Sequence, residues 1–287
     1  MNLCCKSTHK DFKSSCLPYL VELFVFIDDS FQVVLDSPSR LDNLFINSIS
    51  FDNLSVSPDL PVSSLNLSSV NDSCLGVLLT KCPYLRFLEL SNCSIDVIQH
   101  RLQALTLNYL ASLRISDCSN LFPSLPRLPR LRSLVAVSIP DFSLKNFNTK
   151  FPQLKNCILF NCPLAGTLSQ ANYSVESFTI QYMRPNCPLS CFTFLSHFYN
   201  LERLSLQISF LELDNDQLIL PPNIKHLFCT ARFDLVKSSL ESLTKLCSIS
   251  GTLYVKKFQS EDARNWLSDF HRLRPLVSSR LGFEFCS

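Results

Sequence analysis

Glycine and charge are both scarce in this chain of 287 residues. It contains four glycines, and charged residues make up only 17% of it. So few glycines exclude a glycine-rich loop of the kind that cradles a phosphate. The 26 basic and 24 acidic residues leave a formal net charge of +2, and the basic residues are scattered, so the long-range field that recruits nucleic acid or anionic lipid is missing. We therefore expect no nucleic-acid partner.

Long apolar runs are also missing. No apolar segment approaches the roughly eighteen residues that a membrane-crossing helix needs, so we expect no membrane span. The run at 17–27 follows three lysines, as a secretory signal would, but Glu22 interrupts it, Asp28 ends it, and no small-residue cleavage site follows. We interpret this run as the first unit of a repeat.

No arrangement of reactive side chains points to catalysis. The five histidines lie in different parts of the chain, and none forms a recognisable nucleophile or metal motif. Cys187 and Cys191 are spaced like half of a zinc site with His197 nearby, but no second Cys/His pair follows, which favours packed or exposed thiols. We expect no enzymatic activity, no catalytic residue, no metal and no cofactor.

A repeated motif organises the sequence. The pattern LxxLxLxxC occurs at Leu85, Leu88, Leu90 and Cys93, and again 25 residues later at Leu110, Leu113, Ile115 and Cys118. Related units begin at Leu20, Leu41, Val62, Leu85, Leu110, Leu131, Leu154, Val175, Leu201, Ile224 and, less clearly, Leu243. Their spacing lies in or beside the range of about 20 to 29 residues that is typical of leucine-rich repeats. No single copy can bury its apolar side, so the copies must stack.

The repeat predicts an α/β solenoid, a leucine-rich repeat horseshoe with a parallel sheet on its concave face. Apolar residues at helical spacing predict short helices at 95–109 and 190–200 on the convex face. The proline-rich connectors at 57–61, 122–130 and 218–223 should be extended or irregular, because proline removes a backbone donor.

Three regions follow from this pattern. Residues 1–19 are predicted to be an irregular N-terminal segment, 20–255 the solenoid of about ten or eleven repeats, and 256–287 a C-terminal cap. In the cap, Ser260 is the expected N-cap of an amphipathic helix that carries Trp266 and ends at Pro275, and residues 281–285 should add a last strand.

Cysteine is abundant, with fourteen residues, and the repeat explains several of them. Cys93, Cys118 and Cys162 fall at the turn after a strand, and Cys157 and Cys229 fall at inward strand positions. Such cysteines behave as small buried hydrophobes, which is typical of a reducing compartment. We expect an intracellular protein, in the cytoplasm or the nucleus.

The units at 82–94 and 110–121 resemble the cysteine-containing leucine-rich repeats of F-box proteins and related intracellular receptors. Cysteine or asparagine is missing from the turn of several units, the repeat length is uneven and glycine is nearly absent, which are departures from that family. The resemblance implies protein recognition by the inner face. In F-box members the repeats select a substrate for ubiquitination, and a separate N-terminal helical module binds the ligase adaptor.

The N-terminal helical module of F-box proteins begins with a Leu-Pro signature, which Leu17-Pro18 resembles. Roughly forty residues of helical module should follow that signature, but the repeat unit LDNLFIN already begins at 41. We therefore expect a truncated or absent F-box.

The candidate binding site is the row of strand residues that point away from the core. An apolar row in the middle of a soluble surface favours a partner that covers it. The alternative is an ordinary inner sheet, or one covered by the protein's own terminus. The expected partner-binding residues are Phe87, Arg114, Val135, Val137, Ile158, Phe160, Tyr182, Arg203 and Phe228.

The predicted function is therefore a non-enzymatic interaction module with a protein partner. The alternative is a substrate-recognition subunit of a cullin-type ubiquitin ligase, which would bind a ligase adaptor through the N-terminal segment.

Overall fold

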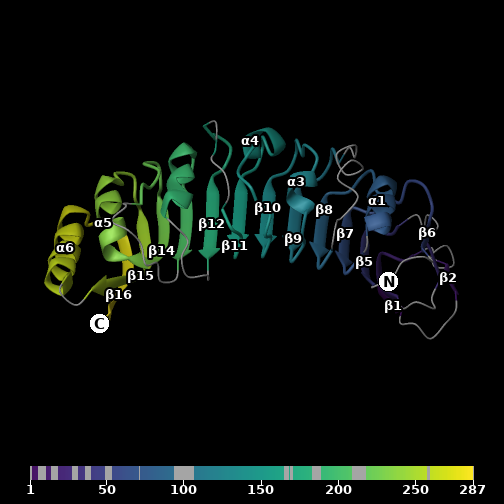
Figure 1. Cartoon of the computed structure of the whole chain (residues 1–287), viewed down its shortest axis with the longest axis horizontal. Coiled ribbons are helices and arrows are strands. Elements are labelled where there is room, and N and C mark those ends of the chain that lie inside the picture. Colours follow the sequence, from purple (N-terminus) through teal and green to yellow (C-terminus); the bar gives the residue numbers. More distant parts are fainter. Residues whose placement is uncertain are drawn as a thin grey trace. The chain divides into compact units, whose positions relative to one another are not determined.

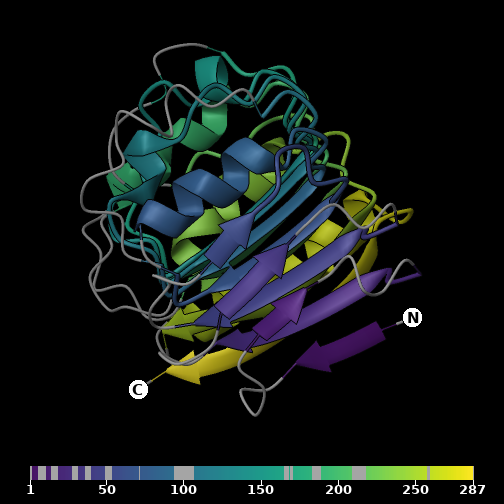
Figure 2. The same ribbon diagram turned by 90° about the vertical axis from the view of Figure 1, so that its right-hand side faces the viewer.

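The computed structural model divides the chain into two compact units. Unit 1 comprises residues 1–143 and 149–154, and unit 2 comprises residues 144–148 and 155–287. The structure describes residues 2–5, 11–13, 19–27, 32–35, 40–48, 54–70, 72–93, 107–164, 168, 171–182, 189–208, 218–256 and 259–286. Each unit has a layer of strands with helical connectors on one side of it (Figures 1 and 2). Among these described residues, no helix has the length and apolar character needed to cross a bilayer.

Unit 1 contains a sheet in which every neighbouring pair of strands is parallel. Its order is β1 (Asn2–Cys5), β3 (Glu22–Ile27), β5 (Asn43–Ser48), β7 (Ser64–Ser68), β8 (Phe87–Ser91), β9 (Ser112–Ser116) and β10 (Ser133–Val137). A second parallel sheet is formed by β2 (Asp11–Lys13), β4 (Gln32–Leu35) and β6 (Leu54–Val56). The helices are α1 (Asp72–Lys81) and the single turn α3 (Leu121–Ser124), while the single turn α4 (Phe147–Lys150) spans the boundary between the units.

Unit 2 has the same construction. Its strands pair in parallel in chain order: β11 (Asn156–Phe160), β12 (Ser177–Tyr182), β13 (Arg203–Ile208), β14 (His226–Arg232), β15 (Ser248–Lys256) and β16 (Ser278–Cys286). The connectors include a 3₁₀ helix η2 (Leu189–His197) and the helices α5 (Phe233–Ser242) and α6 (Ser260–Leu273).

The repeat positions determine where the strands begin. From β3 to β14 along the main sheets, each strand starts two residues after the first apolar residue of its unit, for example β8 after Leu85 and β13 after Leu201. The eleventh start, expected at Leu243, was wrong by three residues, because β15 begins two residues after Leu246. Leu243 directly follows α5 and is fully buried, so its apolar character belongs to that helix end.

Alternating burial along the strands separates two faces. In β8, Leu88 and Leu90 are buried while Phe87 is exposed, and the other strands of five residues alternate in the same way. We call the buried side the inward face and the opposite side the outward face. The apolar residues of the inward face pack against those of the neighbouring strands, which is how stacking buries the leucines of each repeat.

The chain leaves five consecutive strands through the same backbone turn. The residue directly after each of β7 to β11 has a positive φ, between 51° and 55°, and these residues are Ser69, Asn92, Asp117, Ser138 and Asn161. The next residue then points into the core: Val70, Cys93, Cys118, Ile139 and Cys162 are all buried. Asparagine and aspartate tolerate the left-handed region better than most residues, which lets the chain make these turns with almost no glycine.

The cysteines lie where the repeat pattern placed them. Cys93, Cys118 and Cys162 occupy the turn position, and Cys157 and Cys229 occupy inward positions of β11 and β14. All five are buried free thiols. The thiols of Cys93 and Cys118 donate to the carbonyls of Ser91 and Ser116, at 3.3 and 3.2 Å.

The secondary structure of several connectors, and of the N-terminal segment, differs from the prediction made from the sequence. The region 190–200 forms η2, a 3₁₀ helix, and most of the helix expected at 95–109 lies outside the described residues. Helices α1 and α5 were not predicted, and the proline-rich connector at 122–130 contains part of α3. The segment 1–19 was predicted to be irregular, whereas it contains β1 and β2. Pairing with β3 and β4 explains these two short strands, because a strand partner is not visible in a local sequence.

The predicted helix and last strand of the C-terminal region are both present. Helix α6 begins one residue after the cap Gln259, so Ser260 is its first residue and not its N-cap. Trp266 and Phe270 are buried, and the Trp266 indole packs edge-on against the Phe233 ring at 5.3 Å. The Trp266 Nε1 also donates to Glu241 Oε1 at 3.1 Å, which joins α6 to α5.

Asn172 is a buried hydrogen-bonding centre in unit 2. Its side-chain oxygen accepts from the main-chain N–H groups of Ser174 and Val175 at 3.0 and 2.9 Å, and its Nδ2 donates to Asn148 Oδ1 at 2.6 Å. Its own main chain bonds to His197 and Tyr199. The side chain therefore joins its own connector to Asn148, and the main chain joins it to the segment around His197.

We expect Asn172→Ala to lower the free energy of unfolding by about 2–3 kcal/mol, because it leaves buried donors and acceptors without partners. Denaturant titration measures this change. Asn156→Ala is the matched control, since Asn156 is exposed on β11, and it should change the free energy by less than about 0.5 kcal/mol. Equal effects of the two substitutions would contradict the role of Asn172.

Gly251 occupies a position on β15 that has no room for a side chain. Its φ is +124°, and a Cβ built there would lie 2.0 Å from the main-chain oxygen of Cys229, its register partner on β14. Gly282 on β16 differs, because a Cβ there meets nothing closer than 3.9 Å. The backbone therefore requires glycine at position 251 but not at position 282.

Gly251→Ala should lower the free energy of unfolding by roughly 3 kcal/mol or more, through strained backbone and overlap with β14. Gly282→Ala should change it by less than about 0.5 kcal/mol. Thermal and denaturant unfolding of both variants measure the difference. A well-tolerated alanine at 251 would show that β14 and β15 do not approach each other as described.

Candidate functional site

The side chains of the outward face point away from the apolar core. All nine predicted partner-binding residues lie on strands. The eight whose side chains are described occupy outward positions. Phe87 is 52% exposed and Ile158 40% exposed, and Arg114 and Arg203 are also exposed. Val135, Val137, Phe160 and Phe228 are half-buried, and the side chain of Tyr182 lies outside the described residues.

Strand register shows which of these residues lie side by side. In unit 1, Arg114 is opposite Val135 and Ser116 is opposite Val137, so both valines border β9. In unit 2, Ile158 is opposite Thr179 and Phe160 is opposite Gln181. The predicted apolar patch thus has one half on β10 and the other on β11, which belong to different units.

The middle of the outward face of unit 1 is a polar ladder. Glu89 lies between Asn66 and Arg114 in the register of β7, β8 and β9. Asn66 Nδ2 donates to Glu89 Oε2 at 3.0 Å, and Arg114 Nε lies 3.2 Å from Glu89 Oε1. Arg114 is therefore already paired within the chain. As an exposed ion pair it adds little to stability.

Sequence reasoning missed an aromatic group on the same face. Phe24 on β3 stacks on Phe45 of β5, with ring centroids 4.3 Å apart, and Phe26 is 41% exposed on the same strand. The signal was present, because both stacked residues occupy the second outward position of their units, LVELFVF and LDNLFIN. These three phenylalanines enlarge the apolar part of the outward face of unit 1.

A row of charged residues directly precedes the strands of unit 2. Lys155, Glu176, Glu202 and Lys225 occupy the same repeat position before β11, β12, β13 and β14. Lys155 pairs with Glu176 at 2.5 Å and Lys225 with Glu202 at 2.6 Å. The second letter of each unit, in LKN, VES, LER and IKH, carries this signal in the sequence.

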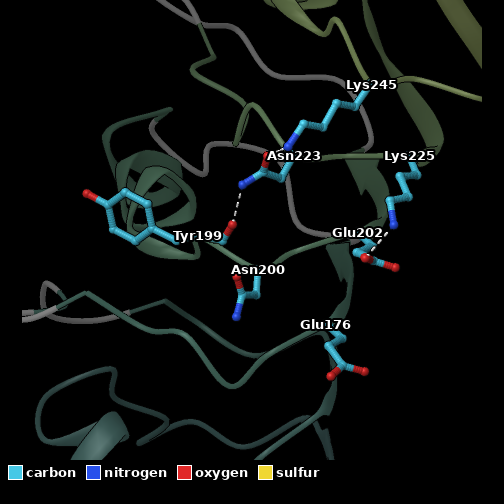
Figure 3. A pocket seen from close by; sticks show the side chains of 7 residues that line it. All are labelled: Glu176, Tyr199, Asn200, Glu202, Asn223, Lys225 and Lys245. Atoms are coloured by element: carbon cyan, nitrogen blue, oxygen red, sulfur yellow. Dashed lines mark hydrogen bonds and ion pairs between the residues drawn. The ribbon is translucent and has the colours of Figure 1, made fainter.

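Part of this row lines an open cavity of about 430 Å³ in unit 2 (Figure 3). Lys225 reaches towards Glu202 across it, and Lys245 donates to Asn223 Oδ1 at 2.6 Å. Hydrogen bonding from Lys225 lowers the pKa of the Glu202 carboxyl, which therefore stays ionised and accepts hydrogen bonds. Of the charged residues that line the cavity, Lys225 and Glu202 pair with each other, whereas Glu176 pairs with Lys155, which lies outside the lining.

Unit 1 carries aromatic and basic side chains just before its strands. Tyr84 and Tyr109 are exposed, their ring centroids are 6.2 Å apart, and the Arg130 guanidinium lies 5.1 Å from the centre of the Tyr109 ring. Each of the three directly precedes the first leucine of its unit. Tyr19 and Arg40 repeat the same contact at 5.5 Å. Sequence reasoning missed this row as well.

Asp141 and Lys150 are partly buried charged residues of unit 1 whose charges attract each other. Burial raises the pKa of the Asp141 carboxyl and lowers that of the Lys150 amine, and each charge partly offsets the shift of the other. The Lys150 Nζ donates to the carbonyls of Phe122 and Pro123 at 3.0 and 2.9 Å. These contacts are with the main chain of α3, so Lys150 holds that connector in place.

The described His, Cys, Asp and Glu residues include no group of three or more that could hold a metal ion. His197 lies at the end of η2, whereas the structure does not describe Cys187 or the side chain of Cys191. His226 Nδ1 lies 2.9 Å from Ser248 Oγ on the next strand, a pairing across the outward face.

Burial raises the pKa of core thiols, including Cys82, Cys157 and Cys229. Cys82 and Cys229 are fully buried, and desolvation raises the pKa of each to about 12 from an ordinary value of 9.0. A raised pKa in the folded state means that the neutral thiols contribute stability below about pH 9, and that this contribution is lost as the pH rises towards 12.

We expect the free energy of unfolding to fall between pH 9 and pH 12, with a slope of up to about 1.4 kcal/mol per pH unit from each thiol. Cys82→Ala and Cys229→Ala should each reduce this slope, even though each also lowers stability by removing core atoms. Cys247→Ala is the control, because Cys247 is exposed. Urea titrations across this pH range measure the slopes, and unchanged slopes in both core variants would contradict the assignment.

Comparison with known proteins gives no family. A scan against protein-family models finds no model that matches the chain, and a search of curated proteins finds no significant match.

Proposed function

We propose that this chain is a non-enzymatic interaction module that binds a partner protein through the outward face of its sheets. In this proposal the chain is a leucine-rich repeat protein of the irregular, cysteine-containing type, and the outward face is the concave side of a horseshoe. The observation that carries the proposal is the set of exposed apolar side chains, Phe26, Phe87 and Ile158, on a face whose other residues are mostly polar. Aromatic and aliphatic side chains with polar neighbours are typical of binding hot spots.

The strand construction supports this function. Leucines stacked between neighbouring strands hold the inward face, so a substitution at an outward position leaves the core contacts intact. Backbone hydrogen bonds between parallel strands fix the spacing of the outward side chains at about 4.8 Å from strand to strand. The face therefore offers a partner a preorganised surface, which reduces the entropy lost on binding.

The remaining side chains of the face supply specificity. The Asn66, Glu89 and Arg114 ladder fixes charged groups beside Val135, and the exposed Arg203 lies next to His226 on β14. Charged groups around apolar anchors select the partner's charge pattern more than they add affinity.

An intracellular location, in the cytoplasm or the nucleus, is part of the proposal. It rests on the buried free thiols at the turn and inward positions, because such thiols persist in a reducing compartment.

We expect Phe87→Glu in unit 1 and Ile158→Glu in unit 2 to weaken partner binding roughly thirty-fold, because a buried charge replaces an apolar anchor. Affinity purification of the tagged full chain from its native cells, with mass spectrometry, identifies the partner, and titration with that purified partner gives the affinity. Two substitutions are needed because the apolar residues of the face belong to both units.

The matched control is Ile219→Glu. Ile219 is 60% exposed and lies in the connector before β14, so the substitution changes charge and apolar area without touching the outward face. Circular dichroism and thermal unfolding establish that all three variants fold. A partner that binds the three variants as tightly as the unmodified chain contradicts the proposal.

The same purification tests the alternative, a substrate-recognition subunit of a cullin-type ligase. That function requires a ligase adaptor among the recovered proteins, and the adaptor should remain bound when Phe87→Glu and Ile158→Glu release the substrate. In residues 1–40, β1, β2, β3 and β4 are strands, whereas the F-box is helical. Leu17-Pro18 lies outside the described residues. Recovery of a partner without an adaptor leaves the plain interaction module.

A further inference from the structure

The strand β16 has one edge that pairs with no other described strand. Within the described part of the chain, β16 pairs with β15 alone, through nine register positions from Ser278 to Cys286. The backbone groups on its other side point away from β15. Sheet edges are usually made unsuitable for pairing by a short strand, a proline or a bulge, and β16 has nine residues, no proline and unbroken pairing.

The side chains of β16 are incompletely covered at this edge. Leu281 and Phe283 point to the inward side but are only half-buried, whereas Ile249 and Leu253 on β15 are 1% and 0% exposed. Phe283 contacts the Phe233 ring edge-on at 6.1 Å. Leu276, which lies two residues before β16, is 95% exposed. An additional strand beside β16 would cover this apolar surface.

The residues of β16 are complementary to themselves in the antiparallel direction. Its centre is Gly282, so a second β16 that runs antiparallel about this residue overlaps all nine positions. In that register Arg280 faces Glu284 of the second copy on the outward side, and Leu281 faces Phe283 on the inward side. Shifting the centre to Arg280 or to Glu284 places like charges opposite each other, which disfavours those registers.

The charges that this register pairs are available. Arg280 and Glu284 are both exposed, and neither forms an ion pair with another described residue. Gly282 at the centre is exposed, and a Cβ there would meet nothing closer than 3.9 Å. A residue that lies opposite its own copy at a two-fold axis has to be small or able to contact an identical side chain. Glycine is small enough.

We propose that β16 is a homodimerisation edge, at which two copies of this chain pair antiparallel about Gly282. The two sheets then continue into each other, with two Arg280–Glu284 pairs on one side and two Leu281–Phe283 pairs on the other. The interface is isologous, as in most homodimers, and it closes the edge, so the assembly stops at two chains. It goes beyond the proposed function and uses a different surface from the outward face.

Sedimentation velocity of the purified full chain tests the assembly. The unmodified chain should sediment as a dimer, at twice the 32.6 kDa of one chain, and dissociate on dilution. Arg280→Glu and Glu284→Arg should each weaken the dimer about ten-fold or more, because each places like charges opposite each other twice. The combined charge exchange, Arg280→Glu with Glu284→Arg, should restore it. A monomer at every concentration tested, or a dimer that both single variants leave unchanged, overturns the proposal.

A cross-link tests the register. Residues opposite each other in an antiparallel pair have Cα atoms about 4.5 or 5.5 Å apart, within the range of a disulfide. Gly282→Cys should therefore give a covalent dimer on mild oxidation, above the background of the unmodified chain. Arg280→Cys is the matched control, because each cysteine then faces Glu284 and not the other cysteine. Equal cross-linking of both variants overturns the register.

The proposal of dimerisation and the proposal of partner binding can be tested independently, because they use different strands. Ile158→Glu, which tests partner binding, should leave the sedimentation of the dimer unchanged, because Ile158 is on β11 and β16 is at the other end of the unit 2 sheet. A dimer that Ile158→Glu abolishes would show that the copies meet through the outward face, and would overturn the assignment to β16.

Discussion

The structure depends on one constraint: a strand of this chain can bury its inward residues only beside another strand of the same kind. Leu88 and Leu90 on β8 have their register partners in Leu65 and Leu67 on β7 and in Leu113 and Ile115 on β9. Each of these side chains is at most 3% exposed. Parallel hydrogen bonding keeps neighbouring strands in register, and the shared apolar layer makes the stack stable only as a whole.

The turns after the strands follow from the same constraint. To begin the next connector, the chain has to leave the sheet without uncovering its core, and a single left-handed residue followed by a buried one does this after five consecutive strands. The main-chain N–H of Ser69 and of Asn92 still bonds to a carbonyl of the next strand, so the turn extends the hydrogen-bonding ladder. Val70 and Ile139 replace cysteine at the buried position, because the site needs a compact apolar side chain and not a thiol as such.

The proposed partner binding uses surfaces that do not take part in stacking. Outward positions are free of core packing, and they carry both exposed apolar side chains and a polar ladder. The residues just before the strands pair with one another in unit 2, where Lys155 and Glu176 and then Glu202 and Lys225 neutralise each other. Among the described strands, β16 differs from the other strands of unit 2 because it has a pairing neighbour on one side only.

The sequence by itself determined the positions of the strands, because each LxxLxL unit alternates with the period of a half-buried strand and recurs at a spacing that requires stacking. It also predicted five buried cysteines at turn and inward positions, and which strand residues point outward. Only the tertiary structure decided that Glu89 holds Arg114, that Phe24 stacks on Phe45, and that Gly251 lies against Cys229. These contacts join residues of different repeats, whose connectors vary in length, so their register depends on how the strands pair and not on any local pattern.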